Sequence, residues 1–183
     1  MEKLNQFALV IYIPDPLARF LDELRLELVA GCRPRAHVTV LPPRPLHDVE
    51  AALKTVRSMS LEFPPFDIEL GDVEVFPRTN VIYIGLRRGE GEMRAMHRAM
   101  NTGPLAFDEP YAYHPHITLA QEFDAAETAR LDTLARTRWQ EYDGPRAFRA
   151  DTVEFVQNTV GKCWLDLADF DLGLPTAVRK LRK

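Results

Sequence analysis

The spacing of apolar residues along the chain alternates between the short period of strands and the 3.6-residue period of helices. Residues 7–13 form an unbroken apolar run, which predicts a buried strand. Apolar positions recur at helical spacing between residues 17 and 28, 49 and 59, 93 and 100, and 124 and 139. Further strands are expected at residues 66–76, 81–86, 148–157 and 162–167.

Two additional segments carry the same motif, His-x-Thr-x, with apolar residues at the x positions. They are His37-Val38-Thr39-Val40 and His116-Ile117-Thr118-Leu119. Successive side chains of a strand point to opposite faces, so each histidine shares a face with its threonine while the apolar residues point into the core. Each motif therefore places an imidazole beside a hydroxyl. The prolines between 42 and 45 are expected to end the first of these strands, because proline cannot donate to a sheet ladder.

The order of predicted elements occurs twice. It runs strand, helix, His-x-Thr strand, helix, strand and strand, and residues 81–86 end the first pass and open the second. The two motif histidines lie 79 positions apart, and residues 72–76 have a counterpart in residues 152–156. No flexible linker separates the halves. We expect one domain over residues 1–183, built from two interleaved lobes with internal repeats near residues 7–86 and 81–167.

A duplicated His-x-Thr-x in a chain of this length resembles the two-histidine phosphoesterase superfamily, and within it the branch of bacterial 2′-5′ RNA ligases and cyclic phosphodiesterases. Residues 113–120 are especially similar to that branch, which often shows Pro-His-hydrophobic-Thr-Leu-Ala. The resemblance implies an α+β, bilobal fold of two antiparallel sheets related by a pseudo-twofold, with helices outside and a central cleft. It also implies that His37 and His116 are the catalytic acid and base, and that Thr39 and Thr118 bind the phosphate.

The residue types suit this chemistry. Hydrolysis of a 2′,3′-cyclic phosphate needs a base to activate water and an acid to protonate the departing ribose oxygen. Imidazole can do either near neutral pH, and paired imidazoles need no metal or other cofactor. Threonine hydroxyls can donate to the non-bridging oxygens, where negative charge accumulates. The reverse reaction would join a 2′-hydroxyl to a cyclic phosphate.

One position departs from the family pattern. Gln121 stands where many relatives carry arginine, so a phosphate contact is lost or supplied elsewhere. Arg35, which shares a face with His37, and Arg44, which follows the proline break, are two possible replacements. Other possible substrate contacts are His114, two residues before His116, and two tyrosines that could stack on a base, Tyr83 and Tyr113.

Two other functions are compatible with the same residues. His114, His116 and His37 could hold a metal ion, although a metal site gives no reason for the threonines. The fold could also serve as a nucleotide-binding or RNA-binding module without turnover. The net charge of −4 argues against binding of long duplex nucleic acid and favours a nucleotide or a single-stranded RNA end as substrate.

The apolar fraction of 46% and the charged fraction of 27% are those of an ordinary globular protein, and the apolar run at residues 7–13 is too short for a membrane span. We expect a cytoplasmic monomer that does not bind membranes. The two cysteines, Cys32 and Cys163, are expected to be free thiols in a reducing compartment.

Overall fold

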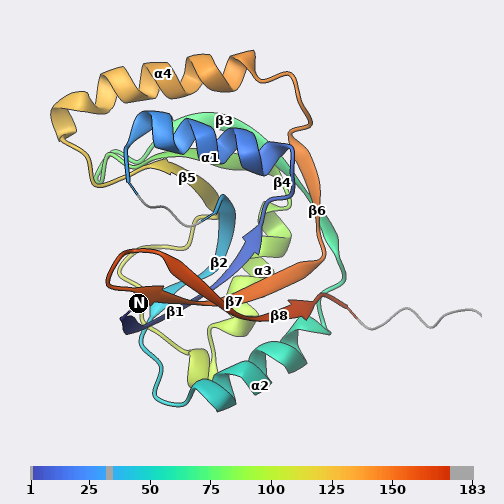
Figure 1. Cartoon of the computed structure of the whole chain (residues 1–183). Helices are drawn as coiled ribbons and strands as arrows, with labels where there is room; N and C mark the ends of the chain where they lie inside the picture. Colours follow the sequence, from blue (N-terminus) through green and yellow to red (C-terminus); the bar gives the residue numbers. More distant parts are fainter. Residues whose placement is uncertain (1, 32–34, 174–183) are drawn as a thin grey trace, which may run out of the picture.

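The structure, a computed structural model, describes residues 2–31 and 35–173. Its strands form two four-stranded antiparallel sheets, which confirms the expected α+β class (Figure 1). The first sheet has the order β2-β1-β7-β8, with β2 at His37–Arg44, β1 at Lys3–Tyr12, β7 at Thr152–Thr159 and β8 at Trp164–Asp171. The second has the order β5-β4-β3-β6, with β5 at His116–Ala120, β4 at Ile82–Arg88, β3 at Phe66–Val75 and β6 at Ala147–Ala150.

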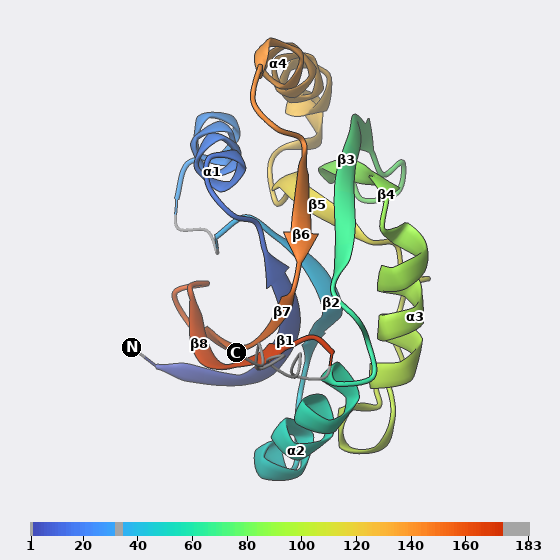
Figure 2. The same ribbon diagram turned by 90° about the vertical axis from the view of Figure 1, so that its right-hand side faces the viewer.

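Within the described residues, four α-helices lie outside the sheets. They are α1 (Leu17–Leu28), α2 (Val49–Ser60), α3 (Glu90–Met100) and α4 (Thr128–Glu141). Figure 2 shows α1 and α4 together at one end of the molecule, α2 at the opposite end and α3 along one side. Asp48 caps α2 by accepting a hydrogen bond from the Ala51 amide, whereas Asp124 caps a short 3₁₀ turn that precedes α4.

The two sheets are built in the same order. In each, the His-x-Thr strand lies at an edge, beside the strand that precedes it in the chain: β2 beside β1, and β5 beside β4. The third position is taken by β7 in one sheet and β3 in the other, the segments whose sequences correspond at residues 152–156 and 72–76. We interpret this correspondence as the internal repeat, whose limits near residues 7–86 and 81–167 stay a prediction.

The prediction of one strand over residues 148–157 is wrong. The chain leaves the second sheet after β6 and enters the first at β7, with Asp151 between them. The buried residues change phase at this point, from Phe148 and Ala150 to Val153 and Phe155. The backbone carbonyl of Asp151 accepts a hydrogen bond from the Leu172 amide instead of a sheet partner. This crossing links the two lobes.

The expected proline break is also wrong, because β2 continues through Pro42 and Pro43 to Arg44. An edge strand tolerates proline, since one side of its backbone has no neighbouring strand to receive an N–H. For Cys163 the expectation of a free thiol is wrong, because its sulfur is in a disulfide. Cys32 lies outside the described residues.

Strand β1 is covered on both faces, which explains its unbroken apolar run. Phe7, Leu9 and Ile11 point into the main core, where the helices pack. Ala8 and Val10 point the other way and pack with Val156, Tyr12 and Trp164. On this same face of the sheet, Val10 and Tyr12 of β1 lie opposite Thr39 and His37 of β2. No helix in the described ranges is long and apolar enough to span a membrane.

Candidate active site

The two His-x-Thr strands meet, as β2 contacts β5 where the edges of the sheets come together. In each motif the histidine and threonine are half-buried, while the apolar residues between and after them are buried. Val38 and Val40 are fully buried in the main core, as expected from strand alternation. Ile117 and Leu119 occupy the same core from the other sheet. The cores behind the motifs therefore hold both imidazoles in place.

Both histidines are oriented by the same hydrogen bond. The Nδ1 atom of His37 lies 2.6 Å from the carbonyl oxygen of Arg35, and that of His116 lies 2.6 Å from the carbonyl oxygen of His114. A carbonyl oxygen can only accept, so Nδ1 carries the hydrogen in both rings. The other nitrogen, Nε2, is left with a lone pair for proton transfer.

The pKa values of both imidazoles lie below the usual value. Burial lowers the pKa of His37 from 6.5 to about 4; the hydrogen bond to the Arg35 carbonyl opposes this, and charges on Arg25 and His116 add to it. Burial likewise lowers the pKa of His116, opposed by its bond to the His114 carbonyl and helped by charge on His114. Both rings are therefore neutral at pH 7 in the free protein, and protonation of one disfavours protonation of the other.

The threonine hydroxyls are available. Within residues 2–31 and 35–173, neither Thr39 Oγ1 nor Thr118 Oγ1 has a hydrogen-bond partner, although both side chains are only half-exposed. Thr39 lies opposite Val10 and Thr118 opposite Tyr83 in their sheets. Each hydroxyl can donate to an anion placed beside the adjacent imidazole.

An ionic and aromatic group surrounds His37. Tyr12 is its partner across the strands, and the Trp164 ring centroid lies 4.9 Å from that of His37. The Arg35 guanidinium lies over the Tyr12 ring, 3.7 Å from its centroid, and is paired with Asp166 at 2.9 Å. The Tyr12 hydroxyl donates to the same carboxylate at 2.6 Å. Arg35 therefore lies near His37 as predicted, with its charge partly balanced.

Aromatic rings dominate around His116. The rings of Phe76 and Tyr83 stack at 4.0 Å, and both present edges to His116 and His114 at 5.1–5.5 Å. The Tyr83 hydroxyl donates to Glu74 at 3.1 Å. Burial is the main cause that raises the pKa of Tyr83 to about 12, and the hydrogen bond to Glu74 is the next largest cause. The structure thus brings two predicted residues, His114 and Tyr83, beside His116.

Arg44 does not reach a substrate site, which contradicts the prediction for it. Its side chain is 2% exposed, and its guanidinium is bound by Glu109 at 2.5 Å, by Asn101 and by the Leu105 carbonyl. Removing one partner of such a buried pair costs about 3–5 kcal/mol, because the other charge is left buried and unpaired. The physical reason is that β2 continues through the prolines and carries Arg44 inward instead of releasing it into a loop.

Tyr113 also has internal partners. Its ring stacks on His97 with centroids 3.8 Å apart and an interplanar angle of 3°, and its hydroxyl donates to the Thr39 carbonyl at 2.7 Å. The ring face that was expected to receive a base is therefore covered on one side by His97. Tyr113 links the two motifs from within.

The model for the family described as the 2′-5′ RNA ligase superfamily matches residues 13–162. The chain belongs to the 2′-5′ RNA ligase superfamily. A candidate phosphoesterase of Bacillus cytotoxicus is 32% identical over 58% of this chain and 62% of its own length. Another from Halalkalibacterium halodurans is 24% identical over 75% of this chain and 79% of its own. The chain thus spans somewhat less than two thirds of the first relative.

Several solved structures have a similar fold. Escherichia coli LigT in complex with 3′-AMP matches with a TM-score of 0.63 and 16% identity, over 93% of this chain and 99% of LigT. LigT in complex with ATP gives 0.59 and 18%, over 94% and 100%. Kluyveromyces marxianus Usb1 gives 0.52 and 14%, over 91% and 98%. At these identities the likeness shows the fold alone.

Gln121, the position at which the family resemblance leads us to expect arginine, is exposed directly after β5. Its neighbour Glu122 forms an ion pair with Lys162, which belongs to the turn between β7 and β8. A cation from the other sheet is thus held beside position 121. Nothing in the spacing of the sequence singles out Lys162, since the contact depends on how the two sheets approach.

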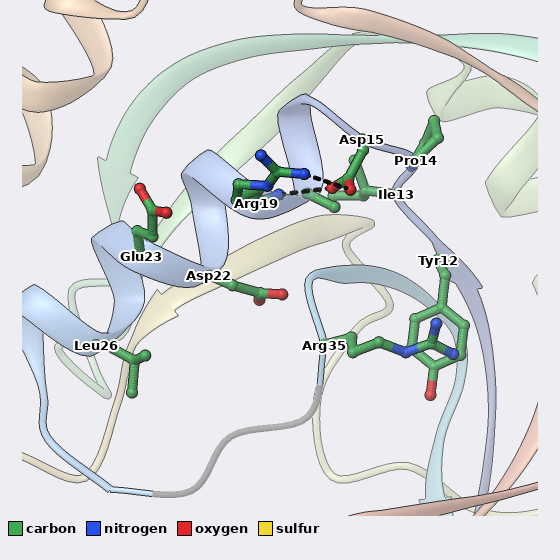
Figure 3. A pocket seen from close by; sticks show the side chains of 10 residues that line it. Tyr12, Ile13, Pro14, Asp15, Arg19, Asp22, Glu23, Leu26 and Arg35 are labelled. Carbon is green, nitrogen blue, oxygen red and sulfur yellow. Dashed lines mark hydrogen bonds and ion pairs between the residues drawn. The ribbon is translucent and has the colours of Figure 1, made fainter.

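A pocket of about 550 Å³ lies next to the first motif, between α1 and the residues Tyr12 and Arg35 (Figure 3). Neither motif histidine lines it. Its wall mixes charges of both signs, with Asp15 bound to Arg19 as the dashed lines show. The pocket adjoins the site through the Tyr12 and Arg35 pair. Among the described residues, no cluster of three or more His, Cys, Asp or Glu side chains fits a metal ion.

The residues that the sequence did not reveal are the partners from neighbouring strands. Three of them reach a motif histidine through sheet pairing or ring contact: Tyr12, Phe76 and Trp164. Asp166 reaches Arg35 through an ion pair. The second half of β1 is an unbroken apolar run. An alternation of apolar and polar residues was therefore absent, and the sequence could not show that Tyr12 shares the face of His37. For Phe76, the correspondence of residues 72–76 with 152–156 was the available signal.

Proposed function

We propose that the chain is a metal-independent phosphodiesterase or ligase that acts on 2′,3′-cyclic phosphates or 2′-5′ linkages of nucleotides and single-stranded RNA ends. The observation that carries this proposal is the identical arrangement of His37 and His116, each with Nδ1 bound to the carbonyl two residues earlier. Both Nε2 atoms are then ready to exchange a proton with the same phosphodiester.

In hydrolysis, one imidazole Nε2 takes a proton from water as the water oxygen attacks phosphorus. The second imidazole, protonated, gives its proton to the ribose oxygen as the phosphorus–oxygen bond to that oxygen breaks. The product is a phosphomonoester, and the two imidazoles have exchanged protonation states. Thr39 and Thr118 donate to the non-bridging oxygens, where they stabilise the developing charge.

Substrate binding prepares the acid. In the free protein both pKa values are lowered, so an imidazolium is scarce at neutral pH. A phosphate anion between the rings raises these pKa values, because opposite charge favours the protonated form. The bound nucleotides of LigT support a small nucleotide as substrate. Among the described residues, Arg35 beside His37 and Lys162 beside the second motif are each paired with a carboxylate, which favours small substrates over long duplexes.

The test is turnover after exhaustive chelation, with nucleoside 2′,3′-cyclic phosphates and a 2′-5′-linked dinucleotide as substrates. We expect hydrolysis by the chelated protein and by a His47→Ala control, since His47 is exposed and outside both motifs. Activity that disappears on chelation and returns with zinc or manganese would instead indicate a metalloenzyme.

A non-catalytic nucleotide-binding module is the second candidate, favoured by the neutral state of both imidazoles in the free protein. The same experiment separates the two. Binding of a nucleoside 2′-monophosphate, together with no turnover of any diester in the panel, would establish the binding module and reject the enzyme.

A further inference from the structure

Strand β2 carries the first motif at the edge of its sheet, and side chains from elsewhere donate to its backbone. The Tyr113 hydroxyl donates to the Thr39 carbonyl at 2.7 Å, and His97 Nδ1 donates to the Val40 carbonyl at 2.9 Å. These two carbonyls lie where the pairing of β1 with β2 shifts register, between Leu9 and Val10. A register shift locally weakens a ladder, so external donors fix the backbone at this point.

Tyr113 belongs to the other motif, three residues before His116. Its own carbonyl accepts from Arg94 of α3 at 2.5 Å, and its ring is stacked on His97 of the same helix. Burial raises the pKa of Tyr113, so the hydroxyl stays protonated and acts as a donor across the whole working range. The Tyr113 side chain therefore connects the segment that precedes His116 to the backbone carbonyl of Thr39.

His97 in turn contacts a buried ionic network. It is 8% exposed, and its Nε2 lies 3.6 Å from Glu109, which in turn pairs with the buried Arg44. Arg44 also donates to the carbonyls of Pro42 and Leu105. The stacked pair of Tyr113 and His97 thus rests on a buried network that spans β2, α3 and the loop before β5.

We propose that Tyr113 is a positioning residue: its hydroxyl, supported by His97, sets the distance between the Thr39 hydroxyl and the imidazole of His116. The inference rests on the proposed function, because it assigns Tyr113 a part in the same reaction. A single intramolecular hydrogen bond makes only a modest net contribution to stability. A small displacement of a phosphate-binding group, however, strongly affects a reaction that depends on alignment.

The experiment is Tyr113→Phe, which removes only the hydroxyl. Tyr142→Phe is the matched control, since it removes a hydroxyl that also donates to a carbonyl, that of Pro145, far from both motifs. We expect kcat on a nucleoside 2′,3′-cyclic phosphate to fall at least ~10-fold in Tyr113→Phe, with a smaller rise in KM. The ¹⁵N–¹H signal of the Val40 amide, which shares a peptide group with the Thr39 carbonyl, should move.

Unchanged kcat in Tyr113→Phe would overturn the proposal. So would a loss of kcat that comes with a large fall in thermal midpoint, because that result assigns Tyr113 to folding alone. If wild type hydrolyses no cyclic phosphate, the proposed function fails and binding of inorganic phosphate decides the positioning role. Weaker binding by at least ~3-fold in Tyr113→Phe than in Tyr142→Phe would support it, and equal binding would reject it.

Discussion

Across the strands from His37 stands Tyr12, whereas across from His116 stands Gly85. A Cβ at Gly85 would come within 3.1 Å of a Glu74 carboxylate oxygen, so the Glu74 side chain already occupies the space beside Gly85. The remaining surroundings differ as well. The side of the site formed around His37, here called the first wall, has the Arg35–Asp166 ion pair. The side formed around His116, the second wall, has the stacked rings of Phe76 and Tyr83. The hydrogen bond that orients each imidazole is nevertheless the same.

This comparison separates two kinds of residue. The histidines, the carbonyls that orient them and the threonines are common to both walls, as an acid–base pair requires when either member must hold or release a proton. The charged and aromatic neighbours are specific to one wall. They would contact the two ends of a diester, which differ chemically, and would set the orientation of the substrate.

The largest expected effect comes from removing what the walls share. His37→Ala or His116→Ala should lower turnover at least ~100-fold, the usual contribution of one acid or base. The measurement is kcat on a nucleoside 2′,3′-cyclic phosphate, with His47→Ala as the control. A near-normal rate in either variant on every cyclic phosphate tested would remove that histidine from the mechanism.

A smaller loss should follow from removing one hydroxyl. Thr39→Val and Thr118→Val keep the shape and the strand preference, so only the donor is lost. We expect kcat to fall ~10- to 100-fold in each, somewhat less than for the strongest oxyanion donors. Thr152→Val, a half-buried strand position outside the motifs, is the matched control. If only one of the two motif variants is affected, only that threonine hydroxyl donates to the phosphate in the transition state.

The smallest effect concerns the stability of the fold. It tests the difference between the pKa of His37 in the folded protein and in the unfolded chain. The folded protein resists protonation of His37 down to pH about 4, while the unfolded chain takes the proton near 6.5. The unfolded state therefore binds more protons between these values, and stability falls as pH falls through that window. In His37→Gln this contribution is absent.

Thermal midpoints of wild type and His37→Gln, measured at pH ~7.5 and ~4.5, check the sign. The fall on acidification should be smaller in the variant by about 5–10 °C, the shift for roughly 2.5 kcal/mol in a domain of this size. Equal falls would show that His37 titrates normally in the folded protein.

Local patterning was sufficient for much of the fold. The helical stripes, the two His-x-Thr strands and the repeated order of elements follow from apolar spacing alone, and the two sheets confirm the class. The change of sheet at Asp151 was missed although its signal is present, because the apolar phase slips between Ala150 and Val153. A strand that alternates without such a slip stays in one sheet.

The remainder of the site depends on pairing between distant strands. Tyr12 and Asp166 reach His37 and Arg35 through the register of β1 and β8, which no local pattern specifies. Arg44 was misassigned because its burial depends on Glu109, 65 positions away, and a charged residue after a proline run otherwise suggests an exposed loop.

The central claim is that His37 and His116 act as one unit on a single phosphodiester. The most direct test is the double-mutant cycle of His37→Ala, His116→Ala and the double variant, measured as kcat on one cyclic phosphate under chelating conditions. Residues that act together are not additive, so the double variant should be no more than ~2-fold slower than the slower single variant. Losses that multiply, to ~10⁴-fold or more for two ~100-fold singles, would show that the histidines act independently and contradict the account.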